Sequence, residues 1–542
     1  MSERSPAVAS LTVLVGLLAI IGAVGLHGAL RDSGSGMVSR AFDGPAIVGL
    51  LLILTAVGSL IIGRAKALPA RATWLAVFGC SLAVAIAAAE LRQAYPVATP
   101  RSFPRSFAAN HLQNFNLTES LVTGQNLLKG AGNTLPMAGG ATQIDTYRMP
   151  GYPLLVASAG IIFRAPANDL ESLGASTVYL QVLLLACAVA FLAYNLPRSV
   201  PTGVAVLLTA ATCWFPQAYD LTQADSMILA SGLLIAGSLC LFDTDTDVST
   251  LPWRYHLLIH AAFGLWFVMR SDVLVGWAGV SVFLYRRHPR WLLLPLVFAL
   301  AIGCSWGAYK KLHGSDFVMT TSNLGHVAFV GLWQTPQQHK FIWEPTDESY
   351  VQWINAHGYI YTEPRANAFA LREVVRFWLT YPGFVISNSA NKAYAYVVAN
   401  VWTGSLMLQP AEWVGRVMRK FVYWALLFAI GVAAATGFKG RRTFLLGWPV
   451  VLNLPLFLVL TYNPRYVPFV SCSIMFAAVP LLASRDFYRR LAAIRWPLAF
   501  LLVGLCVVRL SGPALYRAVL SDRLRYWAPL LDPNSSTLNI LK

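Results

Sequence analysis

The chain has 542 residues, of which 56% are hydrophobic and only 12% are charged, and its mean hydropathy is +0.57. A soluble core of this size does not need so many apolar residues, so the composition excludes an ordinary soluble protein and predicts an integral membrane protein. The net charge of +17 does not indicate nucleic-acid binding, because many of the basic residues stand in short clusters between apolar runs.

Apolar runs divide the chain into segments of the length that crosses a bilayer. A spanning helix needs about 20 apolar residues, and the runs predict about thirteen such helices. They cover residues 11–30, 45–63, 72–90, 177–195, 202–219, 222–241, 255–269, 272–286, 291–309, 419–437, 443–461, 466–484 and 494–511. The first run is too long for the core of a signal peptide, which indicates a retained helix. The pairs over 202–241 and 255–286 are short and broken by polar residues, which favours hairpins that do not cross completely.

Basic residues in short loops predict the orientation, because such loops stay on the cytoplasmic side. With the N-terminus inside, four clusters agree: Arg64, Lys66 and Arg71; Arg286, Arg287 and Arg290; Lys439, Arg441 and Arg442; and Arg485, Arg489, Arg490 and Arg495. The same orientation predicts two long loops, near 91–176 and 310–418, on the outer side.

The two outer loops hold most of the polar and acidic residues, and long loops of this kind are usually functional. In the first, "NLTESLVTGQNLLKGAG" predicts a short helix that Gly130 ends. The second is rich in aromatic residues, which favours an interfacial or sugar-facing surface. These aromatic residues are Trp333, Trp343, Trp353, Trp378, Tyr359 and Tyr361.

The stretch "IDTYRMPGYPLLVASAG", residues 144–160, combines two charges with a rigid turn. Its two prolines fix the backbone around Gly151, and Tyr152 is expected to bring a hydroxyl to the membrane surface. The turn can therefore hold Asp145 and Arg148 at a fixed depth. An ordinary helix start with solvated charges is the alternative.

The two first-loop motifs together resemble the first outer loop of the polyprenyl-phosphate-sugar-dependent glycosyltransferases of the GT-C class. This superfamily includes the protein O-mannosyltransferases and the lipid A aminoarabinose transferases. Three later stretches follow in the family's order: "QADSMILASGLLIAG" is similar to a helix that begins with an acid, "GLWFVMRSDVLVGWAGV" to a short hairpin with an arginine at its tip, and "NPRYVPF" to a late Arg-Tyr element.

The resemblance covers residues 110–480 and implies a domain organisation. It predicts an all-α polytopic membrane protein with a GT-C-like core over 72–511. The helices within 1–71 are then an N-terminal addition, and 512–542 form a tail on the outer side.

The chain departs from the family at the expected catalytic aspartate, where Asn116 stands. An amide cannot accept a proton, so the general base is open. The family's next acid falls on Glu119, and two other carboxylates could act instead: Asp145, or Glu90 at the outer end of the third helix.

The implied reaction needs few groups. A carboxylate accepts the proton of the attacking hydroxyl, and arginines stabilise the charge that grows on the leaving lipid phosphate. Arg148, Arg270 and Arg465 are predicted at the outer boundary, with Tyr152 and Tyr466 orienting lipid phosphate or sugar. Charges at that depth are functional candidates. Simpler roles are also open: Arg270 and Asp272 would cap a hairpin tip, and Arg465 would reach phospholipid headgroups.

The sequence gives no sign of a resident cofactor. The seven cysteines have no C-x-x-C spacing, and His326, His339 and His357 lie too far apart for a helical metal pair. "DTDTD" at 243–247 is predicted on the cytoplasmic side. We therefore expect neither a structural metal nor a disulfide, while a catalytic divalent ion stays open because some relatives use one.

The sequence thus predicts a glycosyltransferase of the bacterial inner membrane that transfers a sugar from a polyprenyl-phosphate donor, by a direct displacement, at the extracytoplasmic face. The acceptor would be a glycan, a lipid or a protein, and the sugar, the stereochemistry and the oligomeric state are open. The absence of a nucleotide-sugar fingerprint favours the lipid-linked donor. Two alternatives are a transporter or flippase for a lipid-linked glycan, and a membrane scaffold without catalysis.

Overall fold

The computed structural model describes residues 78–79, 82, 115–136, 142–144, 148–195, 225–239, 248–321, 323–333, 336–337, 340–341, 347–360, 363–398, 460 and 496. Several expectations lie outside these residues: those for Glu90, Asp145, Arg465 and Tyr466, for the helices at 11–30, 45–63, 202–219, 419–437 and 466–484, and for the tail. The predicted helices at 72–90, 443–461 and 494–511 are described at only one to three residues each.

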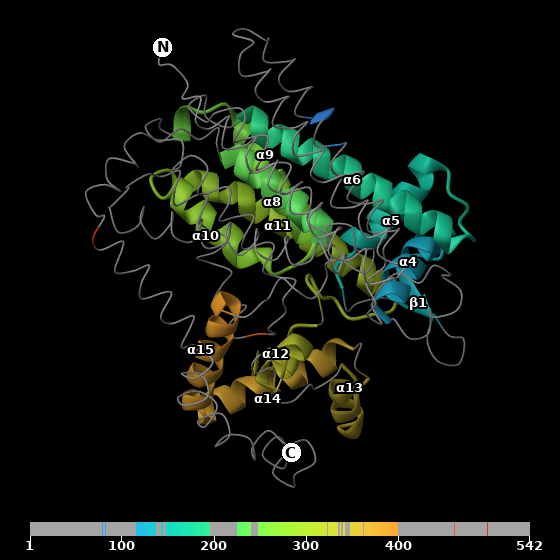
Figure 1. Ribbon diagram of the computed structural model, residues 1–542, viewed down its shortest axis with the longest axis vertical. Helices are drawn as coiled ribbons and strands as arrows, with labels where there is room; N and C mark the ends of the chain where they lie inside the picture. Colours follow the sequence, from blue (N-terminus) through green and yellow to red (C-terminus); the bar gives the residue numbers. More distant parts are fainter. Residues whose placement is uncertain are drawn as a thin grey trace, which may run out of the picture.

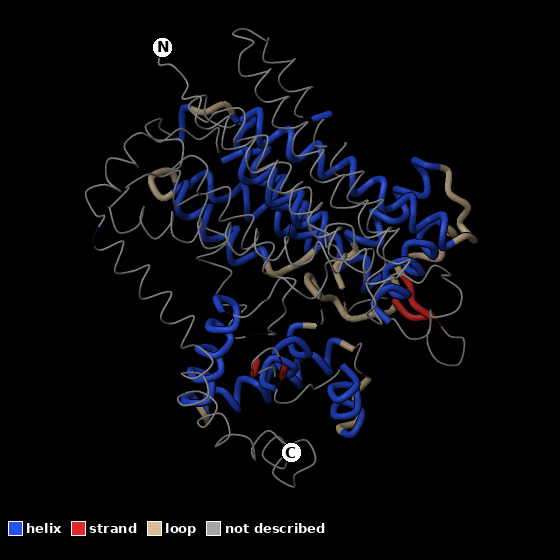
Figure 2. The backbone as a smooth tube through the Cα atoms, viewed as in Figure 1, coloured by secondary structure: helices blue, strands red, loops and turns tan. Residues whose placement is uncertain are grey.

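The described part is predominantly helical, with two short antiparallel hairpins (Figure 2). Its helices are α4 (Phe115–Leu128), α5 (Gly151–Phe163), α6 (Leu170–Asn195), α8 (Asp225–Leu239), α9 (Trp253–Met269), α10 (Val273–Tyr285), α11 (Leu293–Leu312), α12 (Leu324–Trp333), α13 (Asp347–Ala356), α14 (Pro364–Thr380) and α15 (Pro382–Val398). Short 3-10 turns cover Val248–Thr250 and Pro289–Leu292. The hairpins pair β1 (Thr134–Pro136) with β2 (Thr142–Ile144), and β3 (Pro336–Gln337) with β4 (Lys340–Phe341).

The helices form two groups (Figure 1). In the first, α8 packs between α6 and α9, and α11 packs on α9, while α4 and α5 pack together at one end of α6. In the second, α12, α13, α14 and α15 surround a separate core. The long loop predicted at 310–418 therefore contains a folded helical unit.

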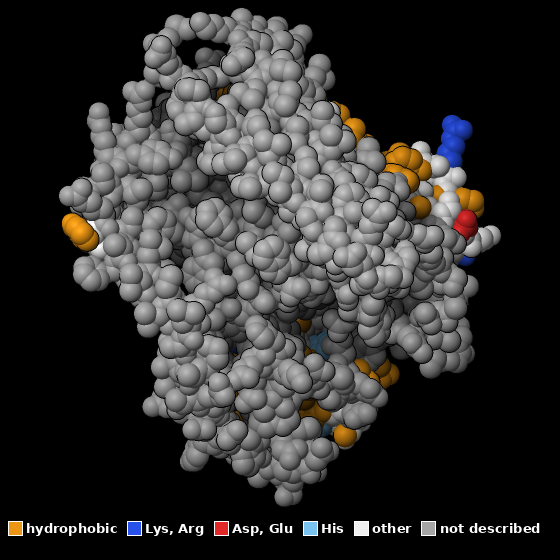
Figure 3. Space-filling view, in the orientation of Figure 1, with side chains coloured by type: hydrophobic (Ala, Val, Ile, Leu, Met, Phe, Trp, Pro, Cys, Tyr) orange, Lys and Arg blue, Asp and Glu red, His pale blue; other side chains and the backbone are white. Residues whose placement is uncertain are grey.

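Two helical segments are long and apolar enough to cross a membrane: Ser172–Leu192, with 21 residues, and Pro289–Leu312, with 24. Both overlap segments that the apolar runs predict. Hydrophobic side chains lie exposed on α5, α6 and α11, and those over α5 and α6 are visible in Figure 3. Such a surface suits lipid. The arrangement of about thirteen spans stays a prediction.

The hairpin predicted over 255–286 is confirmed as α9 and α10. Since α10 has 13 residues, it is about 20 Å long at 1.5 Å per residue, which is shorter than the hydrocarbon layer. The helix predicted at 177–195 begins earlier, at Leu170. The carboxylate Oδ1 of Asp169 accepts a hydrogen bond from the backbone N–H of Ser172 at 3.1 Å, which caps that new start.

Glycines allow α4 and α5 to approach closely. A Cβ on Gly124 would overlap the side chain of Val156, and a Cβ on Gly160 would lie 2.6 Å from a methyl group of Leu128. Gly130 has a φ of +75°, a left-handed conformation that favours glycine, and α4 ends just before it at Leu128. The helix and its stop are therefore confirmed.

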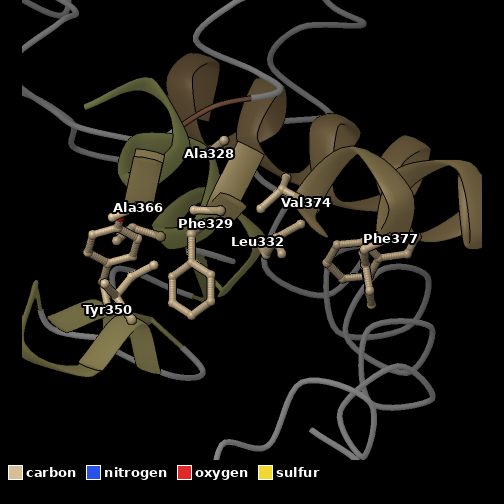
Figure 4. Close-up of a cluster of buried hydrophobic side chains, with 11 residues drawn as sticks. Ala328, Phe329, Leu332, Tyr350, Ala366, Val374 and Phe377 are labelled. Atoms are coloured by element: carbon tan, nitrogen blue, oxygen red, sulfur yellow. The ribbon is translucent and has the colours of Figure 1, made fainter. Parts of the chain in front are cut away.

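The core of the second group is aromatic (Figure 4). Phe329 of α12 stacks on Trp353 of α13 with ring centroids 4.4 Å apart, and Tyr350 is fully buried beside them. From α14, Val374 and Phe377 complete this core. Much of the aromatic content that predicted an interfacial or sugar-facing loop is thus used in packing.

Candidate functional site

Two of the predicted phosphate-binding arginines lie at one junction, where α5 begins and α9 ends. Arg148 precedes the turn into α5, is half-buried, and has its Nε atom inside the protein surface. Gly151 lies against the end of α9, because a Cβ there would come within 2.6 Å of the carbonyl oxygen of Val268 and 2.8 Å of Sδ of Met269. The chain reaches Arg270 immediately after this contact. The glycine of the Pro-Gly-Tyr-Pro turn is therefore required by the close approach of the two backbones.

Arg270 and Asp272 form the tip of the α9–α10 hairpin. Arg270 ends α9 in an extended conformation, and its backbone N–H bonds the carbonyl of Trp266 at 2.7 Å. Its guanidinium forms an ion pair with Oδ2 of Asp272 at 3.1 Å, and both side chains are 25% exposed. Asp272 stands at the N-cap of α10 but makes no side-chain cap hydrogen bond. The carboxylate thus pairs with Arg270 and does not cap the helix.

A contact between two hydroxyl groups also holds the hairpin tip. The hydroxyls of Ser271 and Thr321 lie 3.2 Å apart, which joins the tip to the segment after α11. That segment runs back along α11, because Met319 covers Gly303 and Phe317 covers Gly307. The tip is therefore held by α5, by α9 and by residues 317–321.

Lys310 adds a buried cation near the end of α11. Its side chain is fully buried, its Nζ donates to the carbonyl of Thr320 at 2.7 Å, and it lies 4.8 Å from the ring centroid of Trp306. One residue earlier, Tyr309 accepts a hydrogen bond through its hydroxyl from the backbone N–H of Asn133 at 2.7 Å. The Tyr309 contact joins α11 to the turn that follows α4, and the Lys310 contact joins α11 to the segment after it.

A chain of buried hydrogen bonds connects α9 to α10. The indole of Trp277 can only donate, and it bonds Nδ1 of His260 at 2.9 Å, so a neutral His260 carries its proton on Nε2. That nitrogen lies 3.0 Å from the hydroxyl of Tyr285, which in turn lies 3.0 Å from Nδ1 of His256. The four side chains fix the register of the hairpin and so the direction in which it carries Arg270.

Tyr152 differs from its expected exposure at the membrane surface. It is only 4% exposed, and its hydroxyl accepts a hydrogen bond from Nε2 of Gln181 at 2.9 Å. The junction thus lies beside the middle of α6, and α6 continues past it toward Leu170. This geometry favours a packing role for Tyr152, while its contact with substrate stays a prediction.

The predicted carboxylates are less completely described. Glu119 lies in α4, which packs on α5, but its side chain is not among the described ones. Asp145, Arg465 and Tyr466 lie outside the described residues. The structure therefore brings together the chain segments that carry Arg148 and Arg270, whereas the role of either carboxylate as the base stays a prediction.

Sequence reasoning missed the buried polar residues of the hairpin and the lysine of α11. A signal for the first exists, because His256 and His260 are one helical turn apart in an otherwise apolar run. Lys310 stands near the end of its apolar run and resembles a helix-end charge. Only the tertiary contacts show that these residues connect elements.

Comparisons with known proteins give no identity: no family model, no curated protein and no solved structure matches the chain.

Proposed function

We propose that this protein is a membrane glycosyltransferase that transfers a sugar from a polyprenyl-phosphate donor to an acceptor at the extracytoplasmic face of a bacterial inner membrane. The observation that carries the proposal is the contact of Gly151 with the end of α9, which brings together the two chain segments that carry Arg148 and Arg270. The GT-C resemblance assigns both arginines to the donor phosphate. Arg270 is partly exposed within its ion pair with Asp272.

The chemistry follows from the charges. The acceptor oxygen attacks the anomeric carbon, the bond from that carbon to the phosphate oxygen breaks, and polyprenyl phosphate leaves with the electron pair. Glu119 or Asp145 takes the acceptor proton, and Arg148, Arg270 and Arg465 stabilise the phosphate. Arginine suits this role because its planar fork binds phosphate oxygens in pairs.

The short hairpin supports a site at the membrane surface. The end of α10 that lies opposite to Arg270 is followed by Arg286, Arg287 and Arg290. Basic residues in short loops stay on the cytoplasmic side, which favours an outer position for the Arg270 tip. A lipid carrier keeps its phosphate at the boundary between hydrocarbon and water. A helix of about 20 Å ends near such a boundary rather than far beyond it.

The test is sugar transfer by purified protein from a radiolabelled polyprenyl-phosphate sugar. We expect Arg148→Ala and Arg270→Ala each to lower transfer at least about a hundredfold, because each removes a donor to the charge that develops in the transition state. Arg254→Ala is the matched control, since Arg254 is an exposed arginine at the other end of α9. Glu119→Gln and Asp145→Asn identify the base.

The alternatives predict other outcomes. A transporter or flippase would bind the labelled lipid and move it across the bilayer of a vesicle without transfer, and a scaffold would do neither. Equal activity of Arg254→Ala and Arg270→Ala would remove the basis for the assignment. Loss of the folded protein in either junction variant, seen as loss of its monodisperse peak in detergent, would indicate a structural role.

A further inference from the structure

Lys392, outside the junction, is fully buried in α15. Its hydrogen-bond partners among the described residues are two backbone carbonyl oxygens, that of Gly331 at 2.7 Å and that of Leu460 at 2.5 Å. Both distances are short, as expected for a strong donor. One side chain therefore joins three segments of the chain.

One of these carbonyls, that of Gly331, belongs to a position where a helix leaves acceptors unused. Gly331 lies in the last turn of α12, whose final carbonyls have no partner within the helix. Leu460 is the next-to-last residue of the predicted spanning helix 443–461. A lysine nitrogen satisfies such carbonyls and is favoured by the negative end of the helix dipole.

Asn388 lies one turn before Lys392 on α15, and the hydrogen bonds of its side chain to described residues go to α12. Its Nδ2 donates to the carbonyl of Gly331 at 3.2 Å and to that of Leu332 at 3.4 Å. The two side chains thus share the end of α12, whereas Lys392 also reaches Leu460. A substitution of Asn388 therefore affects the end of α12 but leaves the contact between Lys392 and Leu460 in place.

We infer that Lys392 is a positioning residue that fixes the unit of α12 to α15 to Leu460, three residues before "NPRYVPF". Arg465 follows Leu460 by five residues, so an extended chain allows about 18 Å between their Cα atoms at most. A fixed Leu460 therefore restricts where the Arg465 guanidinium can lie. The connection itself is independent of the proposed function, whereas its effect on donor use rests on it.

The chemistry of the amine fits this role. Burial lowers the pKa of Lys392 from its ordinary value to about 7, and Leu460 and Gly331 offer two carbonyl acceptors. The amine has at least two N–H donors in either protonation state, which is enough for both acceptors. Glu373, the buried carboxylate of the unit, pairs instead with Arg372 and Arg376 on its own helix.

The experiment compares Lys392→Met with Asn388→Leu by hydrogen–deuterium exchange of the full-length protein. We expect both variants to raise exchange at the end of α12. Only Lys392→Met should raise exchange, by tenfold or more, in peptides that cover Leu460. Equal exchange at Leu460 in wild type and Lys392→Met would overturn the inference, and so would an equal increase in both variants.

A second variant keeps the test decisive if Lys392→Met does not fold. Lys392→Gln has the same consequence for Leu460, because its amide stands on a shorter side chain, and it keeps a polar group in the buried position. In the transfer assay, Lys392→Met should raise the donor KM at least fivefold with kcat within twofold, and Asn388→Leu should change neither. If wild type transfers no sugar, the proposed function fails, while the exchange at Leu460 still decides the connection.

Discussion

Arg270 and Lys392 are both cations near helix ends, but their surroundings differ. Arg270 is 25% exposed and pairs with the carboxylate of Asp272 at 3.1 Å. Lys392 is fully buried, and its partners among the described residues are backbone carbonyls. The first side chain is partly exposed, whereas the second is enclosed by the protein and donates to two backbone carbonyls.

The difference shows that a charge in an apolar chain does not by itself indicate a ligand site. Sequence reasoning treats such charges as functional candidates, because their burial is costly. The cost is offset at Lys392 by two backbone carbonyls, and at Arg270 by the partly exposed carboxylate of Asp272. Exposure and the kind of partner separate the two roles.

The largest expected effect is the pH dependence of Lys392. Its folded pKa of about 7 lies below its ordinary value of 10.5, so between these values the unfolded chain holds a proton that the folded chain has lost. Stability should therefore rise with pH across this window, by at most about 1.4 kcal/mol per pH unit, and stay unaffected by this group below it. Unfolding of wild type and Lys392→Met in detergent across the window measures the difference. An identical pH slope in both would contradict the buried amine.

A second prediction concerns the contact that joins the two arginines. Gly151→Val should destabilise the protein by about 2–3 kcal/mol, because the new Cβ would overlap backbone atoms of Val268 that cannot rotate away. Donor use should fall with it. Gly79→Ala is the matched control, since Gly79 is helical and no described residue lies within 4 Å of its Cβ position, and it should be neutral or slightly stabilising. Thermal unfolding in detergent provides the measurement, and an unchanged midpoint in Gly151→Val would mean that α5 and α9 do not meet as described.

The smallest expected effect comes from the partner of Arg270. Asp272→Asn removes the negative charge that competes with a phosphate, so the donor KM should fall by about two- to fivefold, the range of a partly exposed ion pair. The effect should shrink at high ionic strength. Donor KM measured at low and high salt tests this prediction. A KM that rises instead would show that Asp272 orients Arg270 and does not compete with the ligand.

Local pattern predicted much of the first helical group. The hairpin of α9 and α10 agrees with its apolar runs within two residues at each boundary, because Met269 and Val273 flank a polar tip that breaks the run. Gly130 also ends α4 as its position predicts. The start of α6 was missed because Asp169 caps a turn that apolar content does not reveal.

The second group was less predictable. The segment 310–418 has charged and aromatic residues at mixed spacing, so its polar content indicated a loop, and its helices appear only when their aromatic faces pack together. Tyr152 was also hard to predict from its local sequence. Its position indicated the membrane surface, whereas its buried hydroxyl accepts a hydrogen bond from Gln181 on another helix.

The sequence by itself determined that the chain is dominated by apolar helices and that arginines stand at breaks between them, because length, hydropathy and turn residues act locally. Only the tertiary structure decided which of these breaks between apolar helices lie next to each other. The segments that carry Arg148 and Arg270 meet because Gly151 lets α5 touch the end of α9. Lys392 becomes part of the framework because the fold brings it to two carbonyls. Contacts between residues so far apart in the chain depend on packing shape, which no local pattern encodes.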